Sequence, residues 1–93
     1  MRPLDRHNKR LELGMSTYSE ILLDIISTKE KMMVMEVIHE AVDKKVGSLA
    51  TLHKALKWLT DEKFINFKVN DGDTRMRACS IAHRGTLYLK TFQ

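Results

Sequence analysis

The chain has 93 residues, enough for one small domain with a single core and too few for two. Lysine and arginine outnumber aspartate and glutamate by 16 to 12, which alone gives only weak support for a polyanionic partner. The single cysteine, Cys79, excludes an intrachain disulfide, and no apolar run reaches the roughly 20 residues of a membrane-spanning helix. We therefore expect a soluble, cytoplasmic protein without a membrane partner.

The first 15 residues are polar and basic, contain the only proline, Pro3, and end close to Gly14. We expect residues 1–15 to form a basic N-terminal arm outside the core, and residues 16–93 to form the folded domain. Such an arm is either a disordered tail or a segment that lies against DNA or a partner subunit.

Two helices are predicted after the arm. Thr17 and Glu20 have the spacing of a capping box before an apolar run, so the first helix should begin at Thr17 and end near Ser27. Ser27 and Glu30 repeat this spacing and predict the start of the second helix. Alternatively, residues 29–31 form a connector and the second helix begins nearer Met32.

The second helix has a wide apolar surface. Its predicted core stripe consists of Val34, Val37, Ile38, Ala41 and Val42. Three methionines, Met32, Met33 and Met35, extend the surface beyond this stripe. Methionine fills gaps in a core more often than it builds an interface, but so wide an apolar face leaves room for a dimer contact. We expect a homodimer, built through this face or through the arm.

Residues 43–47 are predicted to form a turn, in which Gly47 suits a positive φ. A third helix should follow, with Ser48 as its N-cap. At about 100° per residue, the buried stripe is formed by Leu49, Leu52, Leu56 and Leu59. The opposite face carries Ala50, Thr51, Lys54, Lys57 and, near its edge, Trp58, whereas His53 lies beside the buried stripe. A lysine-bearing face is usually only solvated, but a Gly-Ser turn before it and a basic hairpin after it favour DNA contact.

A β-hairpin and a short helix complete the predicted domain. The outgoing strand alternates Ile65, Phe67 and Val69 with polar residues, residues 70–72 supply turn chemistry, and residues 76–81 form the return strand. Arg75 and Arg77 are two positions apart, so we expect them on one side of the strand, whereas Cys79 is a small strand hydrophobe. A last helix should begin near His83 or Gly85 and bring Leu87, Tyr88 and Leu89 to the core.

These elements predict an α+β fold of the winged helix-turn-helix type, with three helices, a two-stranded β-hairpin wing and a short C-terminal helix. Residues 47–53 read Gly-Ser-Leu-Ala-Thr-Leu-His and resemble the opening of the recognition helix in short MarR-type regulators, with Leu49 in place of a proline. Asp73 and Arg75 are similar to that family's Asp-x-Arg wing motif, and Gly85 matches the glycine before its last helix. The chain lacks the length for the family's dimerising helices and ligand pocket.

The leading hypothesis is sequence-specific binding of double-stranded DNA by a small transcriptional regulator, with helix 48–62 in the major groove and wing 66–80 on the backbone. The candidates for base contact are Ser48, Ala50, Thr51 and His53, with Thr51 the best candidate for a thymine methyl or hydrogen-bond contact. The candidates for the backbone are Lys54, Lys57, Lys68, Arg75 and Arg77. The resemblance implies that the Asp73 carboxylate orients Arg75.

The alternative hypothesis is a winged helix that binds a host protein, as a phage- or plasmid-type adaptor. Exposed Trp58, the methionines and the modest net charge favour it, because Trp and Met are enriched at protein interfaces. No enzyme activity, cofactor or metal is expected, because the four histidines are scattered and have no partner at metal-ligand spacing.

Overall fold

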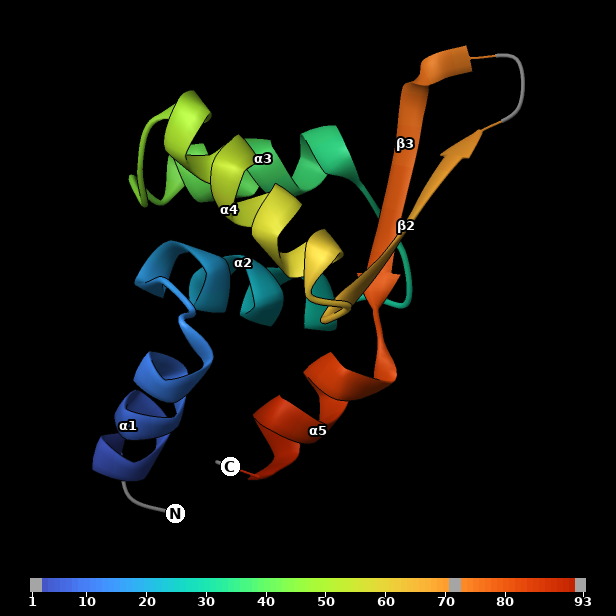
Figure 1. Cartoon of the computed structure of the whole chain (residues 1–93). Helices are drawn as coiled ribbons and strands as arrows, with labels where there is room; N and C mark the ends of the chain where they lie inside the picture. Colours follow the sequence, from blue (N-terminus) through green and yellow to red (C-terminus); the bar gives the residue numbers. More distant parts are fainter. Residues whose placement is uncertain (1–2, 71–72, 92–93) are drawn as a thin grey trace.

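The computed structural model describes the backbone of residues 3–70 and 73–91 and the side chains of residues 7–68 and 77–90 (Figure 1). Within these ranges the fold is α+β, with five helices and one three-stranded antiparallel sheet of order β1-β3-β2. None of the described helices is long and apolar enough to cross a membrane. The elements are α1 (Pro3–Leu13), α2 (Thr17–Ser27), β1 (Met32–Met33), α3 (Val34–Asp43), α4 (Leu49–Asp61), β2 (Ile65–Asn70), β3 (Asp73–Ile81) and α5 (His83–Thr91).

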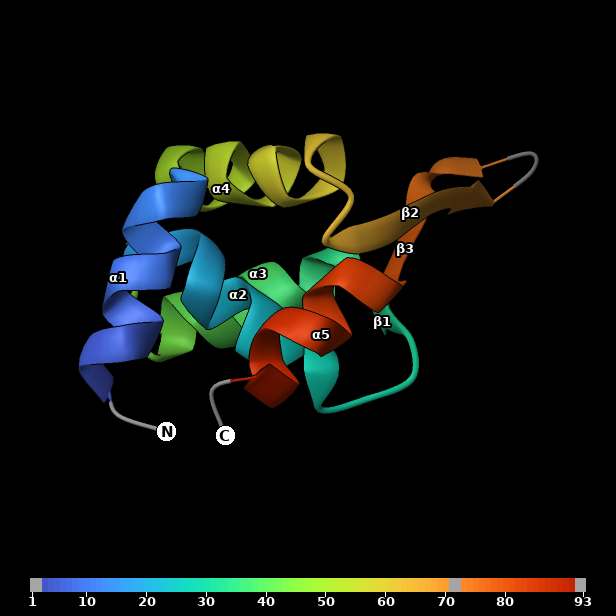
Figure 2. The ribbon, with the colours of Figure 1, turned by 60° about the horizontal axis from the view of Figure 1, so that its bottom comes forward.

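The hydrophobic core lies among α2, α3 and α4, and the base of the hairpin and α5 close it. Figure 1 shows the hairpin projecting away from these three helices, and Figure 2 shows α5 lying along α2. The side chains that are at most 1% exposed come from the three helices and the base of the hairpin: Ser19, Leu22, Leu23, Ile26, Val37, Ile38, Ala41, Leu52, Leu59, Phe64 and Cys79. Tyr88 and Leu89 of α5 are 5% and 8% exposed.

Helix α2 spans the predicted residues, but its N-cap is Ser16 instead of Thr17. The Ser16 hydroxyl oxygen accepts a hydrogen bond from the Ser19 N–H at 3.1 Å. Ser19 is buried, and its own hydroxyl donates to the Ala55 carbonyl of α4 at 3.2 Å. The N-cap of α2 and its hydrogen bond to α4 therefore both lie in the first turn of α2.

The predicted capping box at Ser27 and Glu30 is wrong, because Ser27 ends α2 and donates to the Asp24 carbonyl at 2.7 Å. The connector alternative is the better one. Glu36 forms the observed cap, since its carboxylate accepts a hydrogen bond from the Met33 N–H at 3.1 Å.

Strand β1 was not predicted, and it changes the interpretation of the methionines. Met32 and Met33 pair with Cys79 and Ala78 of β3. Met32 is 2% exposed and belongs to the core, whereas Met35 is 51% exposed. The continuous apolar face expected for the second helix is therefore divided, and Met35 is its exposed part.

Several residues expected in the core are exposed instead. Each stands at the end of an element or on the outer edge of its apolar stripe, where the neighbouring elements do not cover it: Val42, Leu49, Phe67 and Leu87. In α4 the buried stripe is completed by Ala55 instead of Leu49, and in α5 Tyr88 and Leu89 face the core as predicted.

The N-terminal segment differs from the expected arm, because residues 3–13 form α1. Gly14 has a φ of 75° and ends the helix, while the N–H of Met15 donates to the Arg10 carbonyl at 3.0 Å, as in a Schellman motif. Arg10 returns a hydrogen bond from its Nη1 to the Met15 carbonyl at 2.9 Å. Met15 is 2% exposed, so the segment reaches the core at its end.

Gly47 does not have the positive φ that was expected for the turn before α4. The residue with positive φ is Lys45, at 56°. A Cβ on Gly47 would lie 3.2 Å from Cε1 of Tyr18, so a close approach of that ring accounts for this glycine.

Gly85 lies in the first turn of α5, where the helix passes very close to the end of α4. A Cβ at this position would meet the Phe64 carbonyl oxygen at 2.4 Å and Cγ1 of Ile81 at 2.9 Å. The absence of a side chain therefore allows α5 to pack at this distance.

We predict that Gly85→Ala destabilises the protein by about 1–3 kcal/mol, because the added methyl overpacks the contact with Phe64. At an ordinary helix position a glycine-to-alanine substitution stabilises the protein by up to about 1 kcal/mol. The sign of the change in unfolding free energy therefore distinguishes the packing argument from the helix preference. Urea unfolding measures it, with exposed His83→Ala as a control expected within about 0.5 kcal/mol. An unchanged or higher midpoint for Gly85→Ala would contradict the packing argument.

Candidate nucleic-acid interface

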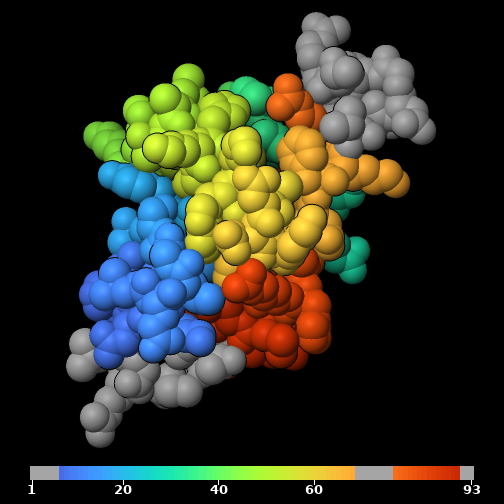
Figure 3. All heavy atoms as spheres, in the orientation of Figure 1, coloured from blue at the N-terminus to red at the C-terminus, as the bar shows by residue number. Residues whose placement is uncertain are grey.

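The exposed face of α4 is a single stripe at helical spacing. Ala50, His53, Lys54 and Lys57 are exposed, and Asp61 continues the stripe one turn later. Figure 3 shows α4 on the surface, with the base of the hairpin at its side. Of the face predicted from the sequence, Ala50, Lys54 and Lys57 are thus accessible, whereas Thr51 and Trp58 are half-buried. His53, which was expected beside the buried stripe, is exposed.

Ser48 begins α4 as predicted. Its hydroxyl oxygen accepts a hydrogen bond from the Thr51 N–H at 3.3 Å, and the hydroxyl donates to Oγ1 of Thr51 at 3.0 Å. Two of the four side chains predicted for base contact, Ser48 and Thr51, are therefore engaged with one another at the first turn.

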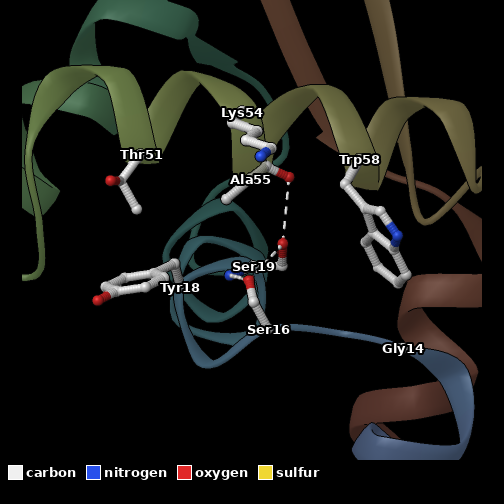
Figure 4. A pocket seen from close by; sticks show the side chains of 8 residues that line it. All are labelled: Gly14, Ser16, Tyr18, Ser19, Thr51, Lys54, Ala55 and Trp58. Atoms are coloured by element: carbon white, nitrogen blue, oxygen red, sulfur yellow. Dashed lines mark hydrogen bonds between the residues drawn. The ribbon is translucent and has the colours of Figure 1, made fainter.

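One edge of α4 borders a hollow of about 280 Å³ between this helix and the start of α2. Figure 4 shows Tyr18 beside Thr51, and Trp58 at the other end of the hollow. Lys54 lines the same space. Thr51 is consequently half-buried on the side of α2, and Tyr18, which sequence reasoning did not select, is the residue that borders it.

Tyr18 could have been found only with knowledge of the packing. It is the second residue of α2, and the adjoining Ser19 is tied to α4 through Ala55. The close approach of the Tyr18 ring to Gly47 brings it beside the turn before α4. The sequence contains no motif that connects Tyr18 with residues 47–51.

The other edge of α4 borders the hairpin, where two adjacent hollows lie. The α4–hairpin hollow, of about 270 Å³, is lined by Val34, His53, Leu56, Lys57, Thr60, Asp61, Phe67 and Arg77. The α3–α4 hollow, of about 260 Å³, is lined by Val34, Met35, His53 and Arg77. The structure therefore brings His53 and Lys57 of α4 together with Arg77 of β3.

The two faces of the hairpin carry different basic residues. Phe67 pairs with Cys79, Lys68 with Ala78 and Val69 with Arg77, and directly opposed residues share a face. Because successive residues alternate, Lys68 and Arg77 lie on opposite faces, with Arg77 on the face of Phe67. The sequence had predicted both Lys68 and Arg77 as contacts to the DNA backbone, because the pairing of the two strands was not known from it.

The predicted pairing of Arg75 with Arg77 rests on regular alternation along β3. The register shifts between Val69 and Asn70, where Asn70 pairs with Asp73, so the alternation does not continue unbroken to Arg75. The side chains of Asp73 and Arg75 lie outside the described residues.

Lys57 is paired with Asp61 across one helical turn, with Nζ and Oδ2 2.9 Å apart. Both side chains are largely exposed, at 76% and 60%, so the pair contributes little to stability. A phosphate could replace Asp61 as the partner of Lys57 at small cost.

Trp58 is not the exposed anchor that the protein-binding alternative assumed. Its ring is half-buried and stacks on Phe64, with centroids 5.6 Å apart and planes at 17°. Trp58 packs against the core, so its presence no longer favours a protein partner.

The described residues contain no group of three or more histidine, cysteine or acidic side chains that could hold a metal ion. Cys79 is a buried strand residue, as predicted, and its thiol lies 3.6 Å from the Met32 carbonyl oxygen. Burial, with a smaller effect from the charge of Glu36, raises the pKa of the Cys79 thiol to about 11. Such a thiol is a poor nucleophile at neutral pH.

Comparison with known proteins gives no match to a family model, to a curated protein or to a solved structure. The resemblance to MarR-type regulators is therefore a prediction that rests on the residues of segment 47–85.

The contribution of the Ser48 cap to the start of α4 can be tested directly. We predict that Ser48→Ala lowers the free energy of unfolding by about 1 kcal/mol, because the Thr51 N–H loses its partner. The matched control is Ser27→Ala, whose hydroxyl bonds only the Asp24 carbonyl at the exposed end of α2 and whose loss should cost less than about 0.5 kcal/mol. Equal losses in urea unfolding would show that Ser48 has no special role in α4.

Proposed function

We propose that the protein is a winged helix-turn-helix protein that binds double-stranded DNA sequence-specifically and regulates transcription, with α4 in the major groove. The observation that supports this proposal best is the convergence of His53 and Lys57 from α4 with Arg77 from the hairpin. An exposed helix bordered by a projecting β-hairpin fits the major groove and the adjacent backbone together.

In this docking, the exposed first half of α4 meets base edges and its cations meet phosphate. Ser48, Ala50 and His53 are the base-contact candidates with exposed side chains, but the Ser48 hydroxyl is hydrogen-bonded to half-buried Thr51 at the start of the helix, which leaves Ala50 and His53 as the better candidates. Lys54 and Lys57 of the stripe, together with Arg77 beside it, hold the backbone. Lys68 would contact phosphate only from the other face of the wing.

We propose further that two copies bind together, since one α4 presents few base-reading side chains. Leu11 of α1 and Leu87 of α5 are exposed apolar residues outside the α4 face, at 58% and 51%. A homodimer formed through α1 or α5 would leave both copies of α4 accessible to DNA.

Binding of a host protein is the second candidate function. Exposed Met35 and Phe67 favour it, because they place apolar surface at the α3–α4 hollow and the α4–hairpin hollow. The two functions differ in their response to salt, since an apolar protein contact depends weakly on ionic strength and a phosphate contact depends strongly on it.

We predict duplex binding with a slope of log K against log salt of roughly −3 to −5, if roughly three to five phosphates are neutralised. Lys57→Gln should weaken all sequences alike and make the slope less negative by about 1. Fluorescence anisotropy across a salt series, on duplexes selected from a random pool, measures both quantities.

The control is Lys90→Gln on α5, an exposed lysine outside α4 and the hairpin. It should leave the slope unchanged. Absence of duplex binding at about 50 mM salt, or a slope that Lys57→Gln and Lys90→Gln change equally, would overturn the proposed docking.

A further inference from the structure

We propose that the α3–α4 hollow receives the C5-methyl group of a thymine, so that Met35, a residue of α3, reads sequence together with α4. This inference rests on the proposed DNA-binding function and names one base that the site selects. The sequence had made Thr51, on the α2 edge of α4, the candidate for thymine contact. The proposed contact lies instead on the hairpin edge of α4.

The lining of the hollow matches a methyl group. Val34 and Met35 supply aliphatic and thioether surface, and the ring of His53 closes the side formed by α4. The thymine methyl is the apolar group that base pairs present in the major groove, whereas the other base edges present hydrogen-bonding groups. An apolar hollow beside a base-reading helix therefore fits thymine better than any other base.

Charge around the hollow favours DNA over an apolar protein segment. Arg77 lines the hollow itself, and Lys57 lines the adjoining one with which it shares His53. Asp61 pairs with Lys57, and Glu36 lies 3.7 Å from Nζ of Lys29, so Arg77 and the Lys57–Asp61 pair together leave one net positive charge beside the hollow. Phosphates on either side of a bound thymine would meet this positive border.

Met35 is exposed but stands on a fixed backbone. The residues before α3 form β1, which pairs with β3 at Ala78 and Cys79, and Glu36 caps the helix through the Met33 N–H. The neighbouring Val34 is 6% exposed and fixes the first turn in the core. The Met35 side chain can thus be presented to DNA without ordering a flexible segment on binding.

The test compares thymine with uracil, which differ by this methyl alone. Deoxyuridine replaces each thymidine in turn in a duplex selected by the wild-type protein, and anisotropy at fixed salt gives the affinity. At one position of each site we expect about fourfold weaker binding, the effect of one buried methyl. Met35→Ala should bind the thymidine duplex more weakly and should lose this difference at that position.

Val42→Ala is the control, because Val42 is an apolar residue of the same helix that is 40% exposed and lies near the other end of α3, outside both hollows. It should keep the full thymine preference. The inference is overturned if no thymidine responds to the replacement, or if Met35→Ala keeps the wild-type preference, which would leave the hollow to an apolar side chain of a protein. Failure of the wild-type protein to bind any duplex would instead overturn the proposed function.

Discussion

Phe64 is the residue at which α4, the hairpin and α5 meet, and the relative placement of these elements depends on it. Its buried ring stacks on Trp58 of α4 and meets Tyr88 of α5 edge-on, with centroids 6.1 Å apart. The guanidinium of Arg84 lies 4.4 Å from the ring centroid. Aromatic pairs contribute about 0.5–1.5 kcal/mol each beyond their buried area. The hairpin cannot turn relative to α4 without separating several of these contacts.

The same cluster sets both edges of the candidate interface. On one edge, Trp58 holds its place against Phe64 and forms the end of the hollow that Tyr18 and Thr51 border. On the other edge, β2 leaves the cluster directly after Phe64, which puts Phe67 beside α4. One packing unit therefore determines how far the wing stands from the helix that we propose to enter DNA.

Helix termini show how much of the fold could be predicted from the sequence and where prediction stopped. The bounds of α2 and the Ser48 cap followed from spacing and residue type, because apolar periodicity and N-cap preference are local properties. The caps of α2 and α3 did not follow, since Ser16 and Glu36 form them instead of the predicted Thr17 and Ser27. The positive φ values did not follow. Lys45 and Lys63, at 56° and 65°, occupy the positions after α3 and α4 where glycine is usual. Gly47 lies against the Tyr18 ring without a positive φ, so a tertiary contact and not the turn accounts for this glycine.

The residue types of the candidate site were predictable, whereas their distribution between two edges of α4 was not. Thr51 and His53 are two positions apart, or about 200° around the helix, so they face different neighbours. Periodicity gives this angle, but only the packing of α2 and the hairpin shows that Thr51 meets Tyr18 and His53 meets Arg77. Because the hairpin edge carries exposed side chains while Thr51 is bound to its own cap, we propose that the edge that includes His53 reads the bases.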